Sequence, residues 1–465
     1  MPEKNELQHE FTVEQGGEGE ALPSPSPRPE PPVAHPPDES PTMTTERLME
    51  EVLSPLNLDA AIERVQENEG APGVDGMPVG ALREYLGKHL RVISEQLLSG
   101  TYKPKPVKRV RIPKDAGGTR DLGIPTVVDR MIQQAILQVL QPRFDPTFSE
   151  SSFGFRPGRS AHQAVLCAQE YIEQGNRWVV DIDLEKFFDR VNHDVLMGRL
   201  AKRIADKRLL KVIRAFLNAG IMDGGVVSAS IEGTPQGGPL SPLLSNVLLD
   251  DLDRELERRG LPFARYADDC NIYVATERAG KRVKEGITRF LSKVLRLKVN
   301  ESKSAVARPW ERKFLGFSFT NQKGTVKTRV APRAVEKLKE KIRKLTPREN
   351  HQAVQVLIAG LNQYLRGWIG YFGIADCRSI FRSLDGWIRR RLRATCWTRW
   401  KNFKRRLAEL TKRGVAPIDA RCAASSGRGP WRLSKTRALQ VALPTEWFIR
   451  LGLPSLDQIA QARAV

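Results

Sequence analysis

The sequence predicts an α+β protein in which short strands carrying charged residues precede a helical region. Apolar runs and alternation predict strands within residues 107–124, 178–183 and 263–275. Apolar residues at helical spacing predict a helix over residues 126–140 and several more after residue 330. The 465 residues leave room for about two to four domains.

Composition restricts the class of protein. The apolar fraction of 40% supports ordinary globular cores, and no run approaches the ~18 consecutive apolar residues of a membrane span. The N-terminal segment MPEKNELQHEF lacks the apolar stretch of a signal peptide. The five cysteines form no CxxC pair, which disfavours a disulfide framework and a cysteine-based zinc site. We therefore expect a soluble, cytoplasmic protein with no membrane partner.

The positive charge is unevenly distributed. The chain has 75 Lys and Arg against 54 Asp and Glu, a formal net charge of +21. Residues 1–42 hold two cations and nine acids, with nine prolines between Pro23 and Pro41, so the remaining residues carry +28. This composition predicts a disordered, acidic, proline-rich tail over residues 1–43. The excess positive charge of the rest favours a nucleic-acid partner over a merely solvated surface.

Residues 107–124 predict a basic β-hairpin. The segment VKRVRI alternates, the Asp115-Ala-Gly-Gly118 segment supplies a turn, and TRDLGI forms the return strand. The hairpin carries five cations, which are Lys108, Arg109, Arg111, Lys114 and Arg120. Such a cluster is suited to contacts with phosphate groups.

The sequence Tyr266-Ala-Asp-Asp269 lies between two apolar strands. Adjacent residues of a strand point to opposite faces, but a turn lets both carboxylates point into one space. Two neighbouring acids repel each other, so the arrangement suits a site for a divalent cation. An aspartate-rich turn without such a role is the simpler interpretation. The flanking strands and the further acids described next favour the cation site.

A second acidic element follows the strand at residues 178–183. Asp181 and Asp183 lie on the same face because the strand period is two, so the pattern alone does not choose between them. Magnesium needs few protein carboxylates and keeps positions for water and phosphate oxygens. Three carboxylates from two β elements, able to hold two metal ions, suit phosphoryl or nucleotidyl transfer.

The region after residue 330 predicts a small helical bundle followed by a basic surface. Three amphipathic helices are expected, through residues 335–345, 354–368 and 380–388. Residues 386–415 contain eleven Lys and Arg against a single acid, with three tryptophans interleaved. A charged run is usually a solvated helix face, but this ratio with tryptophan favours an RNA surface. The final ~50 residues give no clear pattern.

Several segments resemble reverse transcriptase motifs and occur in the same order. They are DLEKFF, YADD, TPQGGP (234–239), NESKS (300–304) and KFLGF (313–317). Three longer segments narrow the match to one group of reverse transcriptases. They are FGFRPGRSAHQA (153–164), RWVVDIDLEKFFDRVNH (177–193) and LNQYLRGWIGYF (361–372). Over about residues 44–455 the chain is similar to bacterial group II intron-encoded reverse transcriptase/maturases. It resembles the class C type most closely, because the chain stops soon after Ser455 and only His351 lies beyond residue 200. We therefore expect no HNH endonuclease domain.

The resemblance implies a right-hand polymerase fold, with fingers and palm built on an antiparallel sheet packed by helices and followed by an α-helical thumb. It implies an N-terminal extension over residues 44–100 and fingers and palm over residues 101–329. The thumb, called domain X in maturases, would cover residues 330–412. Residues 413–465 would form a short basic DNA-binding extension.

The resemblance also implies roles for individual residues. Asp183, Asp268 and Asp269 would be the catalytic metal ligands, with the Leu184 carbonyl as an extra ligand and Asp181 as a structural acid. The nucleotide-binding residues would be Lys114, Arg120, Phe188, Gln236 and Lys303, with Phe188 as the gate that excludes a ribose 2′-OH. Leu315 and Gly316 resemble the primer grip. The expected RNA-binding residues of the thumb are Arg389, Arg393, Arg405 and Arg406.

The function implied is that of an RNA-directed DNA polymerase that also acts as a maturase for its group II intron. Two Mg²⁺ ions are the expected cofactors, and Mn²⁺ is expected to substitute. The expected partners are an RNA template, a DNA or RNA primer, the intron RNA, target DNA and dNTPs. Two alternatives are a domesticated reverse transcriptase in repair or phage defence, and a catalytically inactive RNA-binding splicing factor. The three intact aspartates argue against the second alternative.

Overall fold

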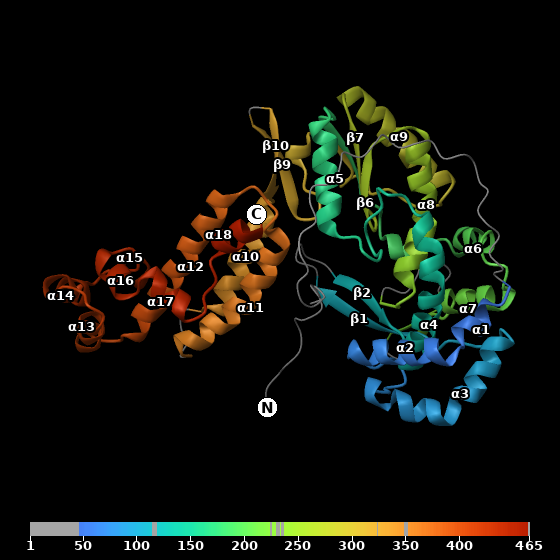
Figure 1. Ribbon diagram of the computed structural model, residues 1–465, viewed down its shortest axis with the longest axis horizontal. Helices are drawn as coiled ribbons and strands as arrows, with labels where there is room; N and C mark the ends of the chain where they lie inside the picture. Colours follow the sequence, from blue (N-terminus) through green and yellow to red (C-terminus); the bar gives the residue numbers. More distant parts are fainter. Residues whose placement is uncertain are drawn as a thin grey trace. The chain divides into compact units, whose positions relative to one another are not determined.

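The fold is described from a computed structural model of the chain (Figure 1). It describes residues 46–113, 119–223, 226–228, 233, 237–322, 324–347 and 352–463. Contacts within the chain divide these residues into two compact units, which meet in the sequence between Leu315 and Gly316. We call residues 46–315 the first unit and residues 316–463 the second unit. The tail expected over residues 1–43 lies outside the described residues.

The first unit is organised around a four-stranded antiparallel sheet with the strand order β6-β7-β3-β8. Its strands are β3 (Trp178–Ile182), β6 (Phe263–Tyr266), β7 (Asp269–Val274) and β8 (Ala305–Ala307). The strands expected within residues 178–183 and 263–275 are therefore present. In the central pair, Asp181 faces Asn271 and Ile182 faces Cys270.

Helices pack against both faces of this sheet, as Figure 1 shows for α5 (Ala161–Glu173) and α9 (Glu277–Lys293). On one face, the ring of Tyr171 in α5 lies 5.7 Å from that of Tyr273 in β7. On the other, α9 comes so close to the strands that a Cβ atom at Gly280 would lie 2.5 Å from a methyl of Val306. The apolar residues of the strands are thus buried from both sides.

A second sheet holds the basic hairpin and has the order β2-β1-β4-β5. Its strands are β1 (Val107–Pro113), β2 (Thr119–Ile124), β4 (Ile221–Asp223) and β5 (Val226–Ser228). β1 and β2 pair antiparallel, as the alternating pattern predicts. On its other edge, β1 pairs with β4 in parallel. Asp223 accepts hydrogen bonds from Arg109 at 3.3 Å and from Arg111 at 2.7 Å, so two of the hairpin cations are held within the sheet.

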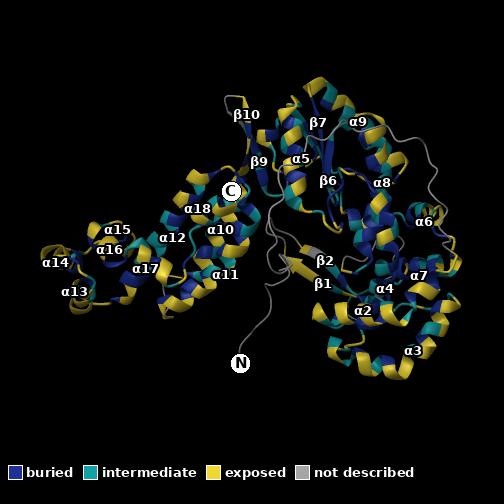
Figure 2. Cartoon of the chain, viewed as in Figure 1, coloured by how far each residue is buried: buried dark blue, intermediate teal, exposed yellow. Residues whose placement is uncertain are grey.

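The described residues of the first unit form seven further α-helices. They are α1 (Leu48–Val52), α2 (Pro55–Glu67), α3 (Leu82–Leu98), α4 (Val127–Phe144), α6 (His193–Ala201), α7 (Lys207–Leu217) and α8 (Ser241–Arg258). Of these, α1 and α2 pack against α4, and α6 packs against α8. Most residues of α4 and α8 are buried, whereas α3 keeps an exposed outer face (Figure 2). Thr126 caps α4 by accepting a hydrogen bond from the Asp129 N–H at 3.1 Å, which explains where the helix begins.

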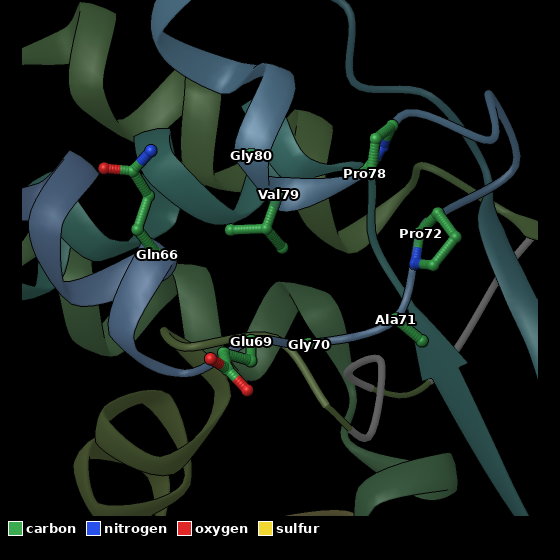
Figure 3. Close-up of a pocket in the computed structure, with 8 residues that line it drawn as sticks. All are labelled: Gln66, Glu69, Gly70, Ala71, Pro72, Pro78, Val79 and Gly80. Atoms are coloured by element: carbon green, nitrogen blue, oxygen red, sulfur yellow. The ribbon is translucent and has the colours of Figure 1, made fainter. Parts of the chain in front are cut away.

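An open pocket lies beside the loop over residues 70–76 (Figure 3). It is lined by Gln66, Glu69, Gly70, Ala71, Pro72, Pro78, Val79 and Gly80. The loop is anchored by Arg130, which donates a hydrogen bond to the Ala71 carbonyl at 2.8 Å. A Cβ atom at Gly73 would lie 2.7 Å from Thr126 Cα, so the loop packs directly against the start of α4.

The second unit begins with a two-stranded hairpin and continues into three long helices. The hairpin pairs β9 (Phe317–Gln322) with β10 (Thr325–Val330). The helices are α10 (Pro332–Leu345), α11 (Val354–Phe372) and α12 (Arg378–Arg399). The apolar residues that predict these helices, such as Leu338, Leu361 and Leu384, are buried.

The end of the chain is more regular than its sequence suggests. Six short helices follow: α13 (Phe403–Lys412), α14 (Pro417–Ser425), α15 (Pro430–Leu433), α16 (Arg437–Ala442), α17 (Thr445–Arg450) and α18 (Leu456–Arg463). α18 packs against α11 and α12, and Asp385 of α12 accepts hydrogen bonds from the backbone N–H groups of Leu456 and Asp457. Helices this short present few apolar repeats, which explains why periodicity did not reveal them. In the part of the chain that is described, no helix has the length and apolar character needed to span a bilayer.

Candidate catalytic site

The strand register brings Asp183 and Asp269 to the same end of the central sheet. Ile182 of β3 faces Cys270 of β7, so Asp183 follows one residue beyond the pair and Asp269 precedes it. Residues directly opposite each other in an antiparallel pair project from the same face. Asp183 and Asp269 therefore belong to one face of the sheet, together with Asp181, which lies two residues before Asp183.

Asp268 lies in the turn that joins β6 to β7. Tyr266 pairs with Asp269, so Ala267 and Asp268 are the two central residues of a tight hairpin. Only the first of them has a positive φ, at +58° for Ala267. That pattern is the one in which glycine is favoured, and an alanine held there costs about 1–2 kcal/mol. The turn therefore places the adjacent acids, but it needs support from its surroundings.

The backbone of Asp183 is fixed by the loop before β8. Its N–H donates to Ser304 Oγ at 2.9 Å, and its carbonyl accepts from the Asn300 N–H at 2.8 Å. The Lys303 Nζ lies 3.7 Å from Asp183 Oδ2, and the lysine side chain is 67% exposed. Ion pairs this exposed contribute no more than about 1 kcal/mol. Lys303 is thus beside the candidate ligand but free to move.

Asp181 is bound differently from Asp183. Its Oδ2 accepts from Arg312 Nε at 2.9 Å and from Nη2 at 2.5 Å, and Arg312 also donates to the Lys303 carbonyl. Burial raises the pKa of Asp181, while Arg312 opposes that rise. Arg312 therefore already occupies Oδ2 of Asp181. This contact distinguishes Asp181 from Asp183, although strand periodicity places both on the same face.

The electrostatics of the site show that negative charge is concentrated there. Desolvation, followed by the charges of Asp268, Asp181 and Asp183, raises the pKa of Asp269 to about 7. Such mutual repulsion is relieved when a cation binds.

The donor set fits a hard divalent cation. Carboxylate oxygens are the ligands that Mg²⁺ prefers, and it retains water and phosphate oxygens in its remaining positions. Within the described ranges, no three His, Cys, Asp or Glu side chains converge closely enough to form a ready-made metal shell. The raised pKa of Asp269 nevertheless shows that the acids influence one another. The site therefore offers carboxylates on one face of the sheet whose mutual repulsion a divalent cation would relieve.

The expected gate residue, Phe188, lies in a short 3₁₀ turn, Phe187–Arg190, that follows Leu184. Lys186 has a φ of +49°, and the chain turns there so that Phe187 is buried and Phe188 only half-buried. The two rings meet edge to face, with centroids 5.2 Å apart. Phe188 is the ring that keeps an accessible surface. Leu184, the candidate extra ligand, is buried and forms an isolated antiparallel β-bridge with Val299.

The other nucleotide-binding candidates are only partly visible. Lys114 and Gln236 lie outside the described residues, and the described part of Arg120 is its backbone in β2, opposite Ile112. Gly237 and Gly238, which follow Gln236, pack tightly. A Cβ atom at Gly237 would lie 2.7 Å from the Gly123 carbonyl, and one at Gly238 would overlap the Gln133 side chain.

The primer-grip candidates, Leu315 and Gly316, have consecutive positive φ values of +51° and +82°. The boundary between the two units falls between them. Within the second unit, Gly316 accepts a hydrogen bond from the Ala331 N–H at 2.9 Å, and a Cβ atom on it would lie 3.2 Å from the Phe372 ring.

Two of the four expected RNA-binding arginines are held within the second unit. Arg393 donates to the Leu443 carbonyl at 2.9 Å and lies over the Phe448 ring. Arg406 donates to the Trp400 carbonyl at 2.8 Å and lies 4.8 Å from the centroid of the Trp397 ring. These guanidinium groups are part of the packing as well as of the charge.

The other two arginines are less constrained. Arg405 forms an ion pair with Glu409 at 2.8 Å and is 66% exposed. Arg389 is half-buried on α12. Arg405 therefore offers the more accessible charge to an external phosphate.

The turn formed by Ala267 and Asp268, which we call the catalytic turn, is supported by residues that the sequence did not reveal. Arg265 is fully buried in an ion pair with Asp253 at 2.5 Å. Gly154 lies directly against the turn, since a Cβ atom on it would overlap the Ala267 nitrogen. Arg265 directly precedes the YADD sequence and Gly154 lies in the FGFRPG segment, but nothing in a single sequence brings the two together.

Two family models match separate parts of the chain. Residues 112–319 match the family described as reverse transcriptase (RNA-dependent DNA polymerase). Residues 335–414 match the family described as group II intron, maturase-specific domain. The first match contains every acidic residue of the site, and the second covers most of α10–α13.

Curated relatives match about half of the chain. Protein YkfC of Escherichia coli strain K12 is 39% identical over 227 residues, which cover 48% of this chain and 60% of YkfC. The group II intron-encoded protein LtrA of Lactococcus lactis subsp. cremoris is 34% identical over 220 residues, covering 47% of this chain and 36% of LtrA. The match thus spans less than two thirds of either relative.

The two solved structures described next are less similar in sequence than these relatives. The structure titled partial Cas6-RT-Cas1--Cas2 complex is 26% identical, with a TM-score of 0.35, over 53% of this chain and 42% of that one. A telomerase of Candida tropicalis is 15% identical with a TM-score of 0.39, over 49% of this chain and 55% of that one. The α+β fold, with its antiparallel central sheet and the helical region after it, is the one expected from the resemblance. The chain thus combines a match to a reverse transcriptase domain with a match to a group II intron maturase-specific domain, in the order expected from its resemblance to group II intron-encoded reverse transcriptase/maturases.

Proposed function

We propose that the protein is an RNA-directed DNA polymerase that extends a primer on an RNA template, and that it also assists the splicing and mobility of a group II intron. The observation that carries the polymerase activity is the placement of Asp183 and Asp269 across β3 and β7, with Asp268 in the adjoining turn. These acids lie within the residues that match the reverse transcriptase model.

Divalent cations held by Asp183, Asp268, Asp269 and the Leu184 carbonyl would activate the primer 3′-OH and offset charge on the leaving pyrophosphate. Mg²⁺ is the ion that the carboxylates suit best, and Mn²⁺ takes similar oxygen ligands. Ser304 and Asn300 fix the backbone of Asp183, which restricts the positions that its carboxylate can reach. Arg312 keeps Asp181 out of the ligand set.

Substrate choice falls to the residues around Phe188. Its half-buried ring would lie where a ribose 2′-OH would otherwise fit, which favours deoxynucleotides. Lys114 and Arg120 on the finger hairpin would bind the triphosphate, with Gln236 beside the incoming nucleotide. Lys303, which is already beside Asp183, can contribute a proton or a positive charge to the pyrophosphate.

The maturase activity is supported by the match of residues 335–414 and by the basic helices of that region. A folded intron presents more phosphate groups than a short template–primer, so it needs a wider cationic surface. α10, α12 and α13 carry most of the cations there. Short helices of residues 413–463 would extend that surface toward target DNA.

Single-nucleotide extension with Mg²⁺ tests the polymerase activity. Asp268→Asn should lower the extension rate at least about a hundredfold, because a lost metal ligand costs several kcal/mol in the transition state. Affinity for the RNA template should stay near that of the wild type. Asp194→Asn is the matched control, because Asp194 is an exposed acid of the same unit that pairs with Arg214. Near-normal extension by Asp268→Asn would overturn the proposal.

A further inference from the structure

Arg265 uses every donor of its side chain in bonds to other parts of the first unit. A guanidinium has five N–H donors in a rigid planar fork. All five are engaged, at distances between 2.5 and 3.0 Å. The acceptors are Asp253 (twice), Asn246, Ser152 and the Ala267 carbonyl. Both members of the Arg265–Asp253 pair are fully buried.

These acceptors come from three different segments. Asn246 and Asp253 lie on α8, Ser152 lies in the loop before α5, and Ala267 is the first central residue of the catalytic turn. Arg265 is itself the third residue of β6. The side chain therefore reaches from the strand to the turn, and ties the turn to a helix and a loop that are distant in sequence.

The same three segments close around Ala267 by independent contacts. Asn246 donates its side-chain amide to the Gly154 carbonyl at 2.9 Å. The Phe153 N–H donates to the Arg265 carbonyl, and the Arg265 N–H donates to the Ser151 carbonyl, each at 2.9 Å. Gly154 lies so close to Ala267 that no side chain fits between them. The left-handed residue is thus enclosed by groups that Arg265 holds together.

We propose that Arg265 is a positioning residue that holds Ala267 in its left-handed conformation and thereby places the carboxylates of Asp268 and Asp269 for metal binding. This rests on the proposed polymerase function, because it assigns a purpose to the placement of those two acids. Arg265 does not touch substrate. Its effect passes through one hydrogen bond, from its Nη1 to the Ala267 carbonyl at 3.0 Å, and through the groups that keep the guanidinium in place.

Lysine at position 265 separates this role from that of a simple buried charge. Lysine keeps the positive charge opposite Asp253 but offers only three donors from a single point, so it cannot serve all the acceptors. Loss of supporting contacts behind metal ligands typically lowers metal affinity or activity by about 10- to 100-fold. We therefore expect Arg265→Lys to raise the Mg²⁺ concentration needed for half-maximal extension by at least about tenfold.

The experiment measures metal binding as well as activity. Tb³⁺ luminescence, sensitised by the neighbouring Tyr266, reports ion binding to the purified full-length protein without any substrate. Mg²⁺ titrations of single-nucleotide extension are run in parallel. Arg265→Lys should weaken Tb³⁺ binding by at least about tenfold, in step with the Mg²⁺ requirement.

Asp206→Asn is the control for lost stability. Asp206 is also a buried acid of the first unit, bonded to the Met49 N–H at 3.0 Å and to Arg208 at 2.9 Å. Its side-chain hydrogen bonds within the described residues go to Met49, Arg208 and Leu209, which lie outside the catalytic turn. Its loss should lower the melting temperature while leaving the Tb³⁺ affinity unchanged. An equal loss of Tb³⁺ affinity in both variants would show that general destabilisation explains the effect, and would overturn the proposal.

Glycine at position 267 supplies a direct test of the mechanism. Glycine adopts a positive φ without the penalty that alanine meets. If Arg265 acts by holding Ala267 in that conformation, Arg265→Lys/Ala267→Gly should recover part of the lost Tb³⁺ affinity. No recovery in the double variant would overturn the mechanism.

Ser152→Ala decides the matter if Arg265→Lys does not fold. It removes a single acceptor of Arg265, at 2.7 Å from Nη2, and adds no volume. A smaller loss of Tb³⁺ affinity in the same direction supports the proposal, and wild-type values in both assays overturn it. If Asp268→Asn leaves Tb³⁺ binding and extension intact, the proposed function itself fails. If Asp268→Asn abolishes both while every variant at 265 and 152 is normal, only the role of Arg265 fails.

Discussion

His193 Nε2 lies 2.6 Å from the carbonyl oxygen of Gly233, to which it donates a hydrogen bond. The other ring nitrogen lies 3.1 Å from the side-chain amide of Asn218, and the imidazole is buried. Gly233 in turn donates to the Val191 carbonyl and packs so tightly that a Cβ atom would lie 2.9 Å from the Phe188 carbonyl. Gly233, three residues before Gln236, is therefore held against the 3₁₀ turn that carries Phe188.

Replacing His193 with Ala should weaken nucleotide binding more than it slows the chemical step. The substitution leaves the Gly233 carbonyl without its buried partner, at a cost of about 1–3 kcal/mol. We expect the KM for dNTP to rise about five- to tenfold. Asn192→Ala is the control, because Asn192 caps α6 through the Val195 N–H at 3.0 Å and does not bond to Gly233. It should lower the melting temperature and leave KM unchanged. An unchanged KM for dNTP in His193→Ala would contradict the prediction that His193 supports nucleotide binding through Gly233.

Phe188→Ala should admit ribonucleotides. Removing the half-buried ring opens space beside the sugar, so the ratio of kcat/KM for dNTP to that for the matching rNTP should fall at least about tenfold. Phe187→Ala is the comparison variant. Its ring is buried in the core, so its loss should cost about 3–5 kcal/mol of stability and leave the ratio unchanged. A shift in the ratio for Phe187→Ala alone would move the gate to that position.

Asp250→Asn should stabilise the protein at neutral pH and have less effect in acid. Burial raises the pKa of Asp250 to about 6, and its Oδ1 has no hydrogen-bond partner among the described residues. A folded-state pKa above the usual value means that the folded state binds the proton more tightly. Ionisation therefore costs stability, fully above about pH 6 and not at all below about pH 4.

The gain at pH 7.5 should be about 1–3 kcal/mol, as measured by urea unfolding. Asp251→Asn is the comparison, because the neighbouring carboxylate is bound to Arg199 at 2.5 Å and its loss should bring no gain. A gain for Asp250→Asn that is equal at pH 4.5 and pH 7.5 would show that ionisation is not the cause.

Arg405 and Arg406 of the second unit should respond differently to replacement by alanine. Arg405→Ala removes an exposed charge, so it should weaken binding of the intron RNA and lower the salt slope of log K by about 0.7–0.9 without changing the melting temperature. Arg406→Ala should lower the melting temperature as well, because the guanidinium holds the Trp400 carbonyl and the Trp397 ring. Filter binding at several salt concentrations, with a melting curve for each variant, measures both. Identical behaviour of the two variants would contradict this division.

The strands and long helices could be predicted because each contains several repeats of one period. The hairpin at 107–124, the strand before Asp183 and the two strands around Asp268 all form where alternation and turn residues indicate. The choice between Asp181 and Asp183 could not come from periodicity, since both lie on one face. It required the Arg312 side chain, which is 131 residues away in sequence.

The support behind the catalytic turn could not be predicted for the same reason. A buried arginine with five acceptors looks, in the sequence, like one more of the many cations of this chain. The helices after residue 400 were missed for another reason, since α15 spans only four residues and α16 six, too few to show a repeat. Long-range side-chain partners and short helices are therefore the two parts of this structure that local pattern does not encode.

The bond between Ser152 and Arg265 joins residues 113 positions apart. Contacts of such long separation slow folding, because the entropy of closing a large loop opposes them. As the chain leaves the ribosome, the loop around Gly154 is synthesised well before α8 and β6, and it has no turn to support until they follow. A chain released before residue 265 would hold Asp183 but could not assemble the catalytic turn. The proposed polymerase activity therefore requires that the chain has been synthesised at least through Asp269 and that these distant segments have come together.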